Sequence, residues 1–385
     1  MKTGITIIGA MLAALAVPAW ADDAAIAAAI DRAAEQAVAA GESPGLQVAV
    51  YKDGKPLLVK GYGLGNIELG TQVDNDSVFR IGSVTKQFTA AALLKLQEEG
   101  KLSLDDPLSD YYPDYPRAAD VTLKQMLHHT SGIHSYTDDE SFLAQAALTK
   151  TTDEWIAYFA KMPKHQDFEP GTDWYYSNTA YFLLGGIVEK VEGKPLADVL
   201  EARFFGPLKL DHTALDDERA IVPGRVAGYE GEPGKYRNAA PISMTIPGGA
   251  GAMRSTADDL AHWNAALFGG KVLAPASFAA MTAPGRLNNG ATSGTAMAKA
   301  EGMPAGEYGY ALFLSDMEGH RKVAHGGGIF GFNSSLSEFP DDHVTVAVIA
   351  NSIGKDLGAR MVAQRIERIA LELPPQPAED PAAKK

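Results

Sequence analysis

The chain has 385 residues, of which 46% are hydrophobic and 21% charged, and its formal net charge is −14. This composition is typical of a globular protein with one large domain or two. The acidic excess and the absence of any Lys/Arg-rich block argue against nucleic acid as a partner and against an anionic membrane surface, because both require clustered positive charge.

Residues 1–21 have the pattern of a secretory signal. Lys2 gives the positive start, an apolar stretch covers 5–17, and 19–21 fits a small-x-small cleavage site. The stretch is short for a membrane anchor, which is the alternative interpretation. The sequence has no cysteine, so disulfides, thiol chemistry and lipid attachment through cysteine are excluded. We expect a periplasmic or secreted protein without a membrane anchor once the signal is removed.

The predicted elements begin with an alanine-rich helix over residues 23–40. Two strands, 46–51 and 57–62, follow as a hairpin, because a turn sequence containing Asp and Gly separates them. The next helix, 84–96, is apolar nearly all round and is therefore expected to be buried.

The middle of the chain has helical patterns separated by long loops. Thr122 and Ser255 are the expected N-caps of helices over 123–129 and 257–267, because a hydroxyl precedes each apolar pattern. A further helix is expected over 179–191.

Strands return after a segment rich in Gly, Ala, Ser and Asn, 285–306, which we expect to be a mobile loop. A final helix is expected over 356–371, and the Pro-rich tail, 373–385, is expected to be disordered. The four predicted strands lie before that helix, at 308–315, 322–325, 332–339 and 344–350.

Strands at both ends of the chain with helices between them predict an α+β fold. One antiparallel sheet would form from the N-terminal and C-terminal segments, flanked by helices, with a mainly helical domain inserted. The expected domain is 22–372, with its α/β part at about 22–85 and 270–372 and its helical part at about 86–269.

Ser83 and Lys86 lie three residues apart at the start of the buried helix, so their side chains share one face. A serine hydroxyl needs a base to become a nucleophile, and a lysine whose pKa is lowered by burial can serve. The alternative is an ordinary polar first turn of a core helix.

Two more motifs follow in order: Tyr176-x-Asn178 before a helix, and His325-x-Gly327 at the end of a strand. Together with Ser-x-x-Lys, this series resembles the serine β-lactamase and penicillin-recognising superfamily, in its class C-like branch. That branch includes class C β-lactamases, D-Ala-D-Ala carboxypeptidases, D-aminopeptidases and β-lactamase-fold esterases. The resemblance covers about residues 24–372.

The resemblance implies a role for each matching residue. Ser83 would attack the substrate carbonyl and form an acyl-enzyme, while either Lys86 or Tyr176 takes its proton. The backbone N–H groups of Ser83 and Gly328 would form the oxyanion hole, and Asn178 would bind the substrate's amide chain.

The third motif departs from the β-lactamase form, because His325 replaces a lysine and Gly326 replaces a hydroxyl residue. With Gly327, these residues are expected to bind substrate. A histidine titrates near ~6.5, so its charge for a substrate carboxylate would vary with pH. The missing hydroxyl should weaken carboxylate recognition further, which puts efficient β-lactam hydrolysis in doubt.

Two other segments match known motifs, but the elements predicted around them do not fit those motifs. Ser352-x-x-Lys355 follows the last strand and contains a glycine, and the glycines of 326–331 precede a strand instead of the helix that a dinucleotide site requires. No H-E-x-x-H occurs and the histidines lack ligand spacing, so we expect no metal and no cofactor.

The leading hypothesis is a secreted serine hydrolase that cleaves an amide or ester bond, as a peptidase or carboxypeptidase on D-amino-acid peptides. The alternatives are a β-lactamase or small-ester esterase, and a non-catalytic penicillin-fold binding protein, against which the intact Ser83, Lys86 and Tyr176 argue. The expected partner is a small-molecule or peptide substrate. The sequence gives neither the natural substrate nor the oligomeric state.

Overall fold

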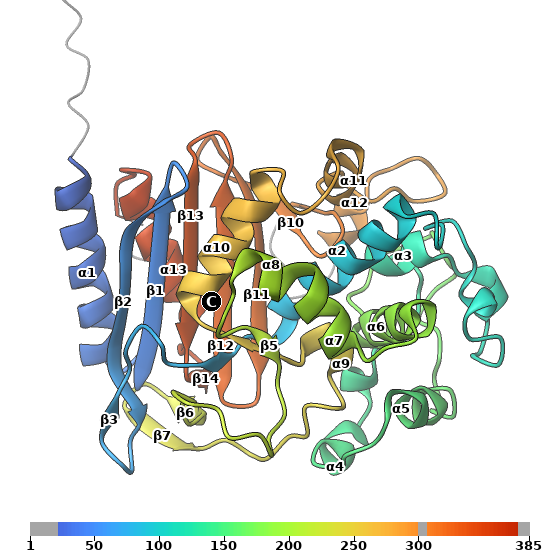
Figure 1. The fold of residues 1–385 in the computed structure, drawn as a ribbon, viewed down its shortest axis with the longest axis horizontal. Helices are drawn as coiled ribbons and strands as arrows, with labels where there is room; N and C mark the ends of the chain where they lie inside the picture. Colours follow the sequence, from blue (N-terminus) through green and yellow to red (C-terminus); the bar gives the residue numbers. More distant parts are fainter. Residues whose placement is uncertain (1–21, 299–305, 376–385) are drawn as a thin grey trace, which may run out of the picture.

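An eight-stranded antiparallel sheet runs through the centre of the protein, with helices on both of its faces (Figure 1). The computed structural model describes residues 22–298 and 306–375. The predicted signal, 1–21, and residues 376–385 of the predicted tail lie outside the described residues.

The sheet has the strand order β3-β2-β1-β13-β12-β11-β10-β9. The N-terminal β1 pairs with the C-terminal β13, from Leu46 opposite Ala350 to Lys52 opposite Val344, so the two ends of the chain fold together. This arrangement confirms the predicted antiparallel sheet. Its strands are β1 (Gly45–Lys52), β2 (Lys55–Asn66), β3 (Thr71–Gln72), β9 (Glu307–Tyr308), β10 (Phe313–Met317), β11 (His320–Ile329), β12 (Phe332–Phe339) and β13 (Val344–Ala350).

Two small sheets lie beside the large one. The first has the order β4-β8-β5, with β4 (Phe79–Arg80), β8 (Met253–Ser255) and β5 (Ala214–Leu215). The second has the order β14-β6-β7, with β14 (Ser352–Gly354), β6 (Tyr229–Glu232) and β7 (Lys235–Asn238).

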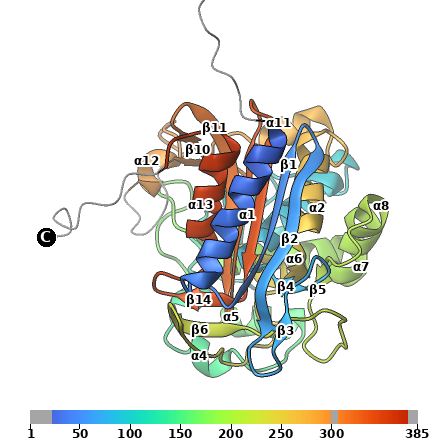
Figure 2. The same cartoon turned by 90° about the vertical axis from the view of Figure 1, so that its left-hand side faces the viewer.

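Strand β13 is buried on both faces, as its continuous apolar sequence predicts. Because side chains alternate along a strand, Val346 and Val348 face one side and Ala347 and Ile349 the other. The valines pack with helices α1 (Asp23–Ala39) and α13 (Ala359–Ala370), which cover that face (Figure 2).

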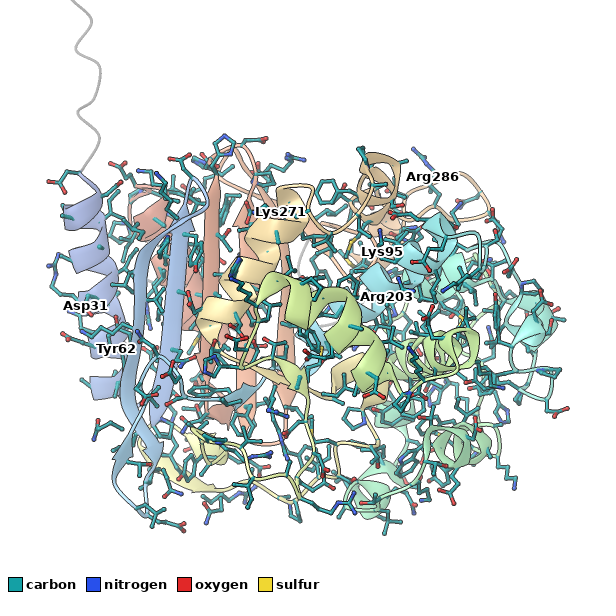
Figure 3. The ribbon with its side chains drawn as sticks, viewed as in Figure 1. Asp31, Tyr62, Lys95, Arg203, Lys271 and Arg286 are labelled. Carbon is teal, nitrogen blue, oxygen red and sulfur yellow. The ribbon has the colours of Figure 1, made fainter. Side chains whose placement is uncertain are left out.

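A polar contact also ties α1 to the sheet. Asp31 of α1 accepts hydrogen bonds from the Tyr62 hydroxyl at 2.8 Å and from Lys60 Nζ at 2.6 Å, both on β2 (Figure 3).

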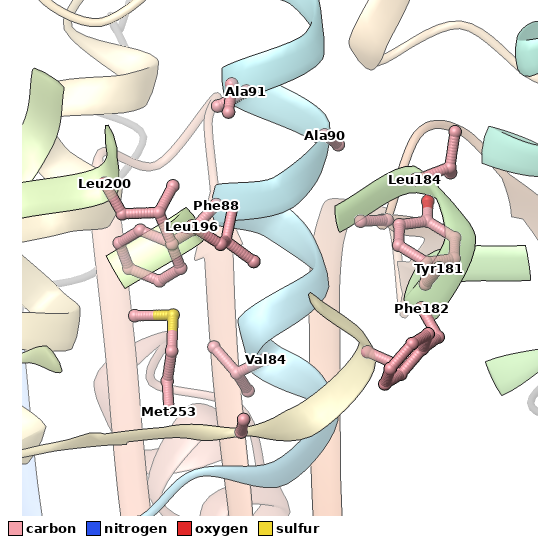
Figure 4. Close-up of a cluster of buried hydrophobic side chains, with 14 of the residues drawn as sticks. Val84, Phe88, Ala90, Ala91, Tyr181, Phe182, Leu184, Leu196, Leu200 and Met253 are labelled. Atoms are coloured by element: carbon pink, nitrogen blue, oxygen red, sulfur yellow. The ribbon is translucent and has the colours of Figure 1, made fainter. Parts of the chain in front are cut away.

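The opposite face carries α2 and the helices that surround it. Phe88 of α2 stacks on Trp263 at a centroid distance of 4.0 Å, and both side chains are fully buried. Val84 and Met253 belong to the same cluster (Figure 4). The helices beyond α1 and α13 are α2 (Thr85–Glu98), α3 (Leu123–Leu127), α4 (Phe142–Gln145), α5 (Thr152–Phe159), α6 (Asn178–Glu192), α7 (Leu196–Leu200), α8 (Gly206–Leu208), α9 (Gly248–Gly251), α10 (Ala257–Phe268), α11 (Pro275–Met281) and α12 (Gly294–Met297).

Two local predictions are corrected by the structure. Thr256, not Ser255, caps α10, because its hydroxyl accepts from the Asp259 N–H at 3.1 Å while Ser255 is still in β8. The predicted strand over 308–315 is divided into β9 and β10, because Ala311 has a φ of 56° and interrupts the extended backbone.

The segment predicted as a mobile loop, 285–306, contains α12, and its residues 299–305 lie outside the described residues. At the start of the predicted tail, the Leu373 N–H donates to the Arg368 carbonyl at 2.8 Å. Among the helices that the structure describes, none combines the length and apolarity needed to span a bilayer.

Phe88→Ala should lower the free energy of unfolding by about 3–5 kcal/mol, because it opens a cavity beside Trp263 in a fully buried cluster. Urea unfolding followed by circular dichroism measures this loss. The control is Leu143→Ala, which removes a side chain on a residue that is 73% exposed and should change stability by less than about 0.5 kcal/mol. Equal losses in the two variants would contradict the central role of this cluster.

Candidate active site

Ser83 lies in a single turn of 3-10 helix, Gly82–Val84, directly before α2. Strand β11 packs against this turn through its glycines. A Cβ atom at Gly327 would lie 1.9 Å from the Ile81 carbonyl oxygen, and one at Gly82 would lie 2.9 Å from the Gly328 nitrogen. Only glycine permits this approach, which brings the Gly328 backbone beside the Ser83 turn as the predicted oxyanion hole requires.

Lys86 is fully buried in the first turn of α2, and its Nζ contacts three acceptors. It donates to Asn178 Oδ1 at 2.7 Å and to the Ala250 carbonyl oxygen at 2.7 Å, and it lies 3.1 Å from Ser83 Oγ, whose hydroxyl can donate or accept. All three acceptors are uncharged, so none offsets the cost of burying an ammonium. Burial therefore holds the pKa of Lys86 well below its ordinary value.

Tyr176 lies just before α6, half-buried beside Ser83 and Lys86. Lys86 Nζ is 4.7 Å from the centre of its ring. Burial raises the pKa of Tyr176 above its ordinary value, while hydrogen bonding with Ser83 acts in the opposite direction. A lowered lysine pKa beside a raised tyrosine pKa favours a neutral amine next to a neutral phenol.

Asn178 is the first residue of α6, but it is not the cap of that helix. Ser177 is the cap, because its hydroxyl accepts from the Ala180 N–H at 3.1 Å. The Asn178 amide accepts from Lys86 and donates to Thr137 Oγ1 at 3.1 Å. Asn178 thus positions Lys86, and its contact with substrate stays a prediction.

His325 lies on β11 with 2% of its surface exposed. Its Nδ1 is 2.6 Å from the Gly326 carbonyl oxygen, which can only accept, so Nδ1 carries the proton. Its Nε2 then accepts from the Tyr308 hydroxyl at 3.1 Å. Burial lowers the pKa of His325 to about 3. The expectation of an imidazole that titrates near neutrality is therefore corrected: this ring is neutral.

Steric crowding alone does not explain why Gly326 stands where the β-lactamase motif has a hydroxyl residue. Gly326 is exposed, and a Cβ atom there would meet only the Ser334 carbonyl oxygen, at 3.3 Å. A side chain at this position would need a small shift of that carbonyl group, and its Cβ atom would meet no other atom.

Ser83, Tyr176 and His325 line one pocket of about 400 Å³. The pocket extends past Gly326 and Gly327 to the start of α13, where Arg360 lines it. The Arg360 guanidinium has no ion-pair partner among residues 22–298 and 306–375. We call this space the Ser83 pocket.

Sequence reasoning assigned no role to three residues that support the site. Ala250 accepts from Lys86, Tyr308 donates to His325, and His129 braces Tyr176. The His129 Nδ1 accepts from the Ser177 N–H at 3.1 Å, and its ring lies 4.3 Å from that of Tyr176. Its φ of 60° is unusual for a residue other than glycine, and no pattern in the sequence signals it.

The second Ser-x-x-Lys motif takes no part in this site. Ser352 is buried in β14, where its hydroxyl donates to Ser43 Oγ at 2.9 Å. The glycines of 326–331 lie in β11 and the turn before β12, which agrees with rejecting a dinucleotide site. In the part of the chain that the structure describes, no group of three or more His, Asp or Glu residues could hold a metal ion.

Comparison with known proteins identifies the family to which the chain belongs. The Beta-lactamase family model matches residues 30–370. Penicillin-binding protein 4* of Bacillus subtilis is 26% identical over 362 residues, which are 88% of this chain and 75% of that protein. The chain spans 62% to 75% of the length of the first curated relatives that it matches.

Two solved structures share the fold over most of their length. A D-stereospecific amidohydrolase from Streptomyces sp. is 30% identical, with a TM-score of 0.73 over 89% of this chain and 98% of the other. The D-amino acid amidase from Ochrobactrum anthropi SV3 is 25% identical, with a TM-score of 0.76 over 90% and 98% of the two chains. The Ser83, Lys86 and Tyr176 cluster and the match over residues 30–370 show that the chain belongs to the β-lactamase family of serine hydrolases.

Proposed function

We propose that this protein hydrolyses amide bonds next to D-amino-acid residues, in peptides or simple amides, through an acyl-enzyme on Ser83. The observation that carries this proposal is the contact between Lys86 Nζ and Ser83 Oγ, in which a fully buried amine is surrounded by uncharged acceptors. The similarity to a D-stereospecific amidohydrolase and a D-amino acid amidase supports the substrate class.

In the acylation step, neutral Lys86 takes the proton of the Ser83 hydroxyl while Oγ forms a bond to the substrate carbonyl carbon. The lowered pKa of Lys86 favours the free amine that this step needs. Tyr176 is the less suitable base, because burial raises its pKa and its phenolate would be scarce. The carbonyl oxygen becomes an oxyanion that accepts from the Ser83 and Gly328 N–H groups.

Collapse of the tetrahedral intermediate breaks the carbon–nitrogen bond, and the leaving amine needs a proton. The Tyr176 phenol, still protonated, gives it and is reprotonated by the Lys86 ammonium formed in the first step. Water then attacks the acyl-enzyme carbonyl, and the Tyr176–Lys86 pair takes its proton. The bond between the carbonyl carbon and Ser83 Oγ breaks, and the pair returns that proton to Oγ, which restores the hydroxyl and releases the acid product. Atoms and charge balance over the cycle.

The pocket favours weak recognition of a substrate carboxylate. His325 is neutral and Gly326 offers no hydroxyl, so residues 325–327 of β11 present neither a charge nor a hydroxyl to a carboxylate. Lys322 of the same strand also lines the pocket, but it is paired with Glu367. Among the described residues that line the Ser83 pocket, Arg360 on α13 is the cation without an ion-pair partner, and it is exposed. We therefore place amidase or aminopeptidase activity ahead of carboxypeptidase activity, and efficient β-lactam hydrolysis last.

Hydrolysis of small esters is a second candidate. The same uncharged residues 325–327 that disfavour a carboxylate suit an uncharged ester, and an ester needs less help in expelling its leaving group. We also propose that the protein acts outside the cytoplasm, on the pattern of residues 1–21, which fractionation of cells expressing the full chain would test.

Ser83→Ala should abolish turnover of amide and ester substrates and covalent labelling by a fluorophosphonate probe, because it removes the attacking oxygen. Mass spectrometry of the labelled protein is the measurement. Ser352→Ala is the matched control and should keep full labelling, since Ser352 lies in β14 against Ser43. Labelling that survived in Ser83→Ala and disappeared in Ser352→Ala would disprove the assignment.

Lys86→Met should slow acylation at least ~10²-fold, because it removes the base and leaves a side chain of similar length. In the wild type, the acylation rate should rise with pH through the lowered lysine pKa and then level off, since the amine must be free. Stopped-flow acylation with an activated amide measures both. A wild-type rate that climbed up to about pH 10, where an ordinary lysine titrates, would contradict Lys86 as the buried base.

Arg360→Gln should reduce the preference for a carboxylate-bearing substrate by ~3- to 10-fold, the scale of a partly exposed charged contact. The measurement is kcat/KM for N-acetyl-D-Ala-D-Ala divided by kcat/KM for its C-terminal amide. Ionisations of the enzyme that affect both substrates equally cancel in this ratio. Because the pKa of His325 is about 3, the wild-type ratio should stay constant across the neutral range. A ratio that fell as the pH rose through ~6–7, the ordinary imidazole range, would show instead that protonated His325 binds the carboxylate.

A further inference from the structure

A second cavity, of about 180 Å³, lies against the segment that leads to Ser83, and three arginines line it. They are Arg80 on β4, Arg254 on β8 and Arg225 in the loop before β6. The cavity exceeds by far the roughly 10–15 Å³ that one water molecule needs. It shares no lining residue with the Ser83 pocket.

The positive charge of this cluster is only partly balanced. Its one buried carboxylate, Asp216, lies 2.9 Å from Arg80 Nε, 2.9 Å from Arg225 Nη2 and 3.7 Å from Arg254 Nη1. The three arginine side chains are only 17%, 28% and 21% exposed, in that order. Two positive charges therefore remain in excess in a partly desolvated space, where like charges repel most strongly.

A second acidic residue nearby does not remove this excess. Asp217 is 52% exposed, and its carboxylate lies 3.5 Å from Arg219, a cation outside the cluster. Its backbone carbonyl accepts from Arg225 Nη2 at 2.8 Å, which orients that guanidinium without neutralising it.

The cluster also holds donors that no protein group satisfies. The Nε atoms of Arg225 and Arg254 are both buried and have no hydrogen-bond partner among the described residues. Unpaired buried donors are costly, and a guanidinium can satisfy them only with an added acceptor, because it does not lose its proton. Burial lowers the pKa of Arg254; Asp216 acts in the opposite direction, and the neighbouring Arg225 adds to the lowering.

We propose that this cavity is a binding site for a small tetrahedral oxyanion of the phosphate or sulfate type. Planar guanidinium groups match the oxygens of such an anion with paired N–H donors. One anion beside Asp216 would offset the excess charge and supply acceptors for the unpaired donors.

Such an anion would join the two segments that position the catalytic residues. Arg80 pairs with Arg254 across strands β4 and β8, and the Ile81 N–H donates to the Met253 carbonyl at 3.0 Å. Ser83 follows β4, and Ala250, which holds Lys86, precedes β8. The bound anion would therefore stabilise the folded protein beside the active site.

Thermal unfolding of the full chain tests this proposal in chloride, acetate, phosphate and sulfate at equal ionic strength and neutral pH. Phosphate and sulfate should raise the Tm by at least ~2 °C over chloride and acetate, because a ligand that binds only the folded state stabilises it. Equal values of Tm in all four salts would overturn the proposal, and so would an equal rise with acetate.

Arg254→Met should abolish the phosphate-specific rise, and Arg225→Met should do the same if the first variant does not fold. Asp216→Asn should enlarge the rise, because it removes the resident competing carboxylate; a rise smaller than that of the wild type counts against the site. Two control variants should keep the phosphate-specific rise in Tm. They are Arg321→Met, which breaks an exposed pair with Asp341, and Arg360→Gln in the Ser83 pocket. A rise lost only in Arg360→Gln would place the anion in the Ser83 pocket and overturn the proposal.

Discussion

The burial of Lys86 among three uncharged acceptors is the constraint on which the active site depends. Ser83, Asn178 and Ala250 come from the turn before α2, the start of α6 and helix α9, which are distant in sequence. Their geometry holds only if the sheet and the surrounding helices are fixed against each other. The pairing of β1 with β13 supplies part of that rigidity, so the reactivity of one amine depends on contacts between the two ends of the chain.

A second constraint is the close approach of β11 to the Ser83 turn. The absence of a side chain at Gly327 lets the strand reach the Ile81 carbonyl, and the Ser334 hydroxyl donates to the same oxygen at 2.7 Å. This packing aligns a backbone donor with the nucleophile, but it also buries His325 and keeps its imidazole neutral. Residues 325–327 of this strand therefore bring backbone groups, and no charge, to the Ser83 turn.

Several features could be predicted from the sequence because short-range patterns determine them. Strands β12 and β13 have the predicted bounds, since continuous or alternating apolar residues end at clear turns. Ser83, Lys86 and Tyr176 could be named because their motifs are local, and the structure brings them together. Ala250 and Tyr308 could not be identified, because each acts through a contact that only tertiary packing creates. The neutral state of His325 was missed for the same reason, since burial decides it.

Lys86 and the arginine cluster respond to burial in opposite ways because their chemistry differs. A lysine among uncharged acceptors can release its proton, and the neutral amine that results can act as the base in the proposed acylation of Ser83. An arginine begins from a pKa so high that burial cannot neutralise it, so Arg80, Arg225 and Arg254 keep their charge around Asp216. The fold can relieve that excess only by adding an anion or admitting water. Burial thus favours a neutral amine at Lys86 and creates a demand for negative charge at the arginine cluster.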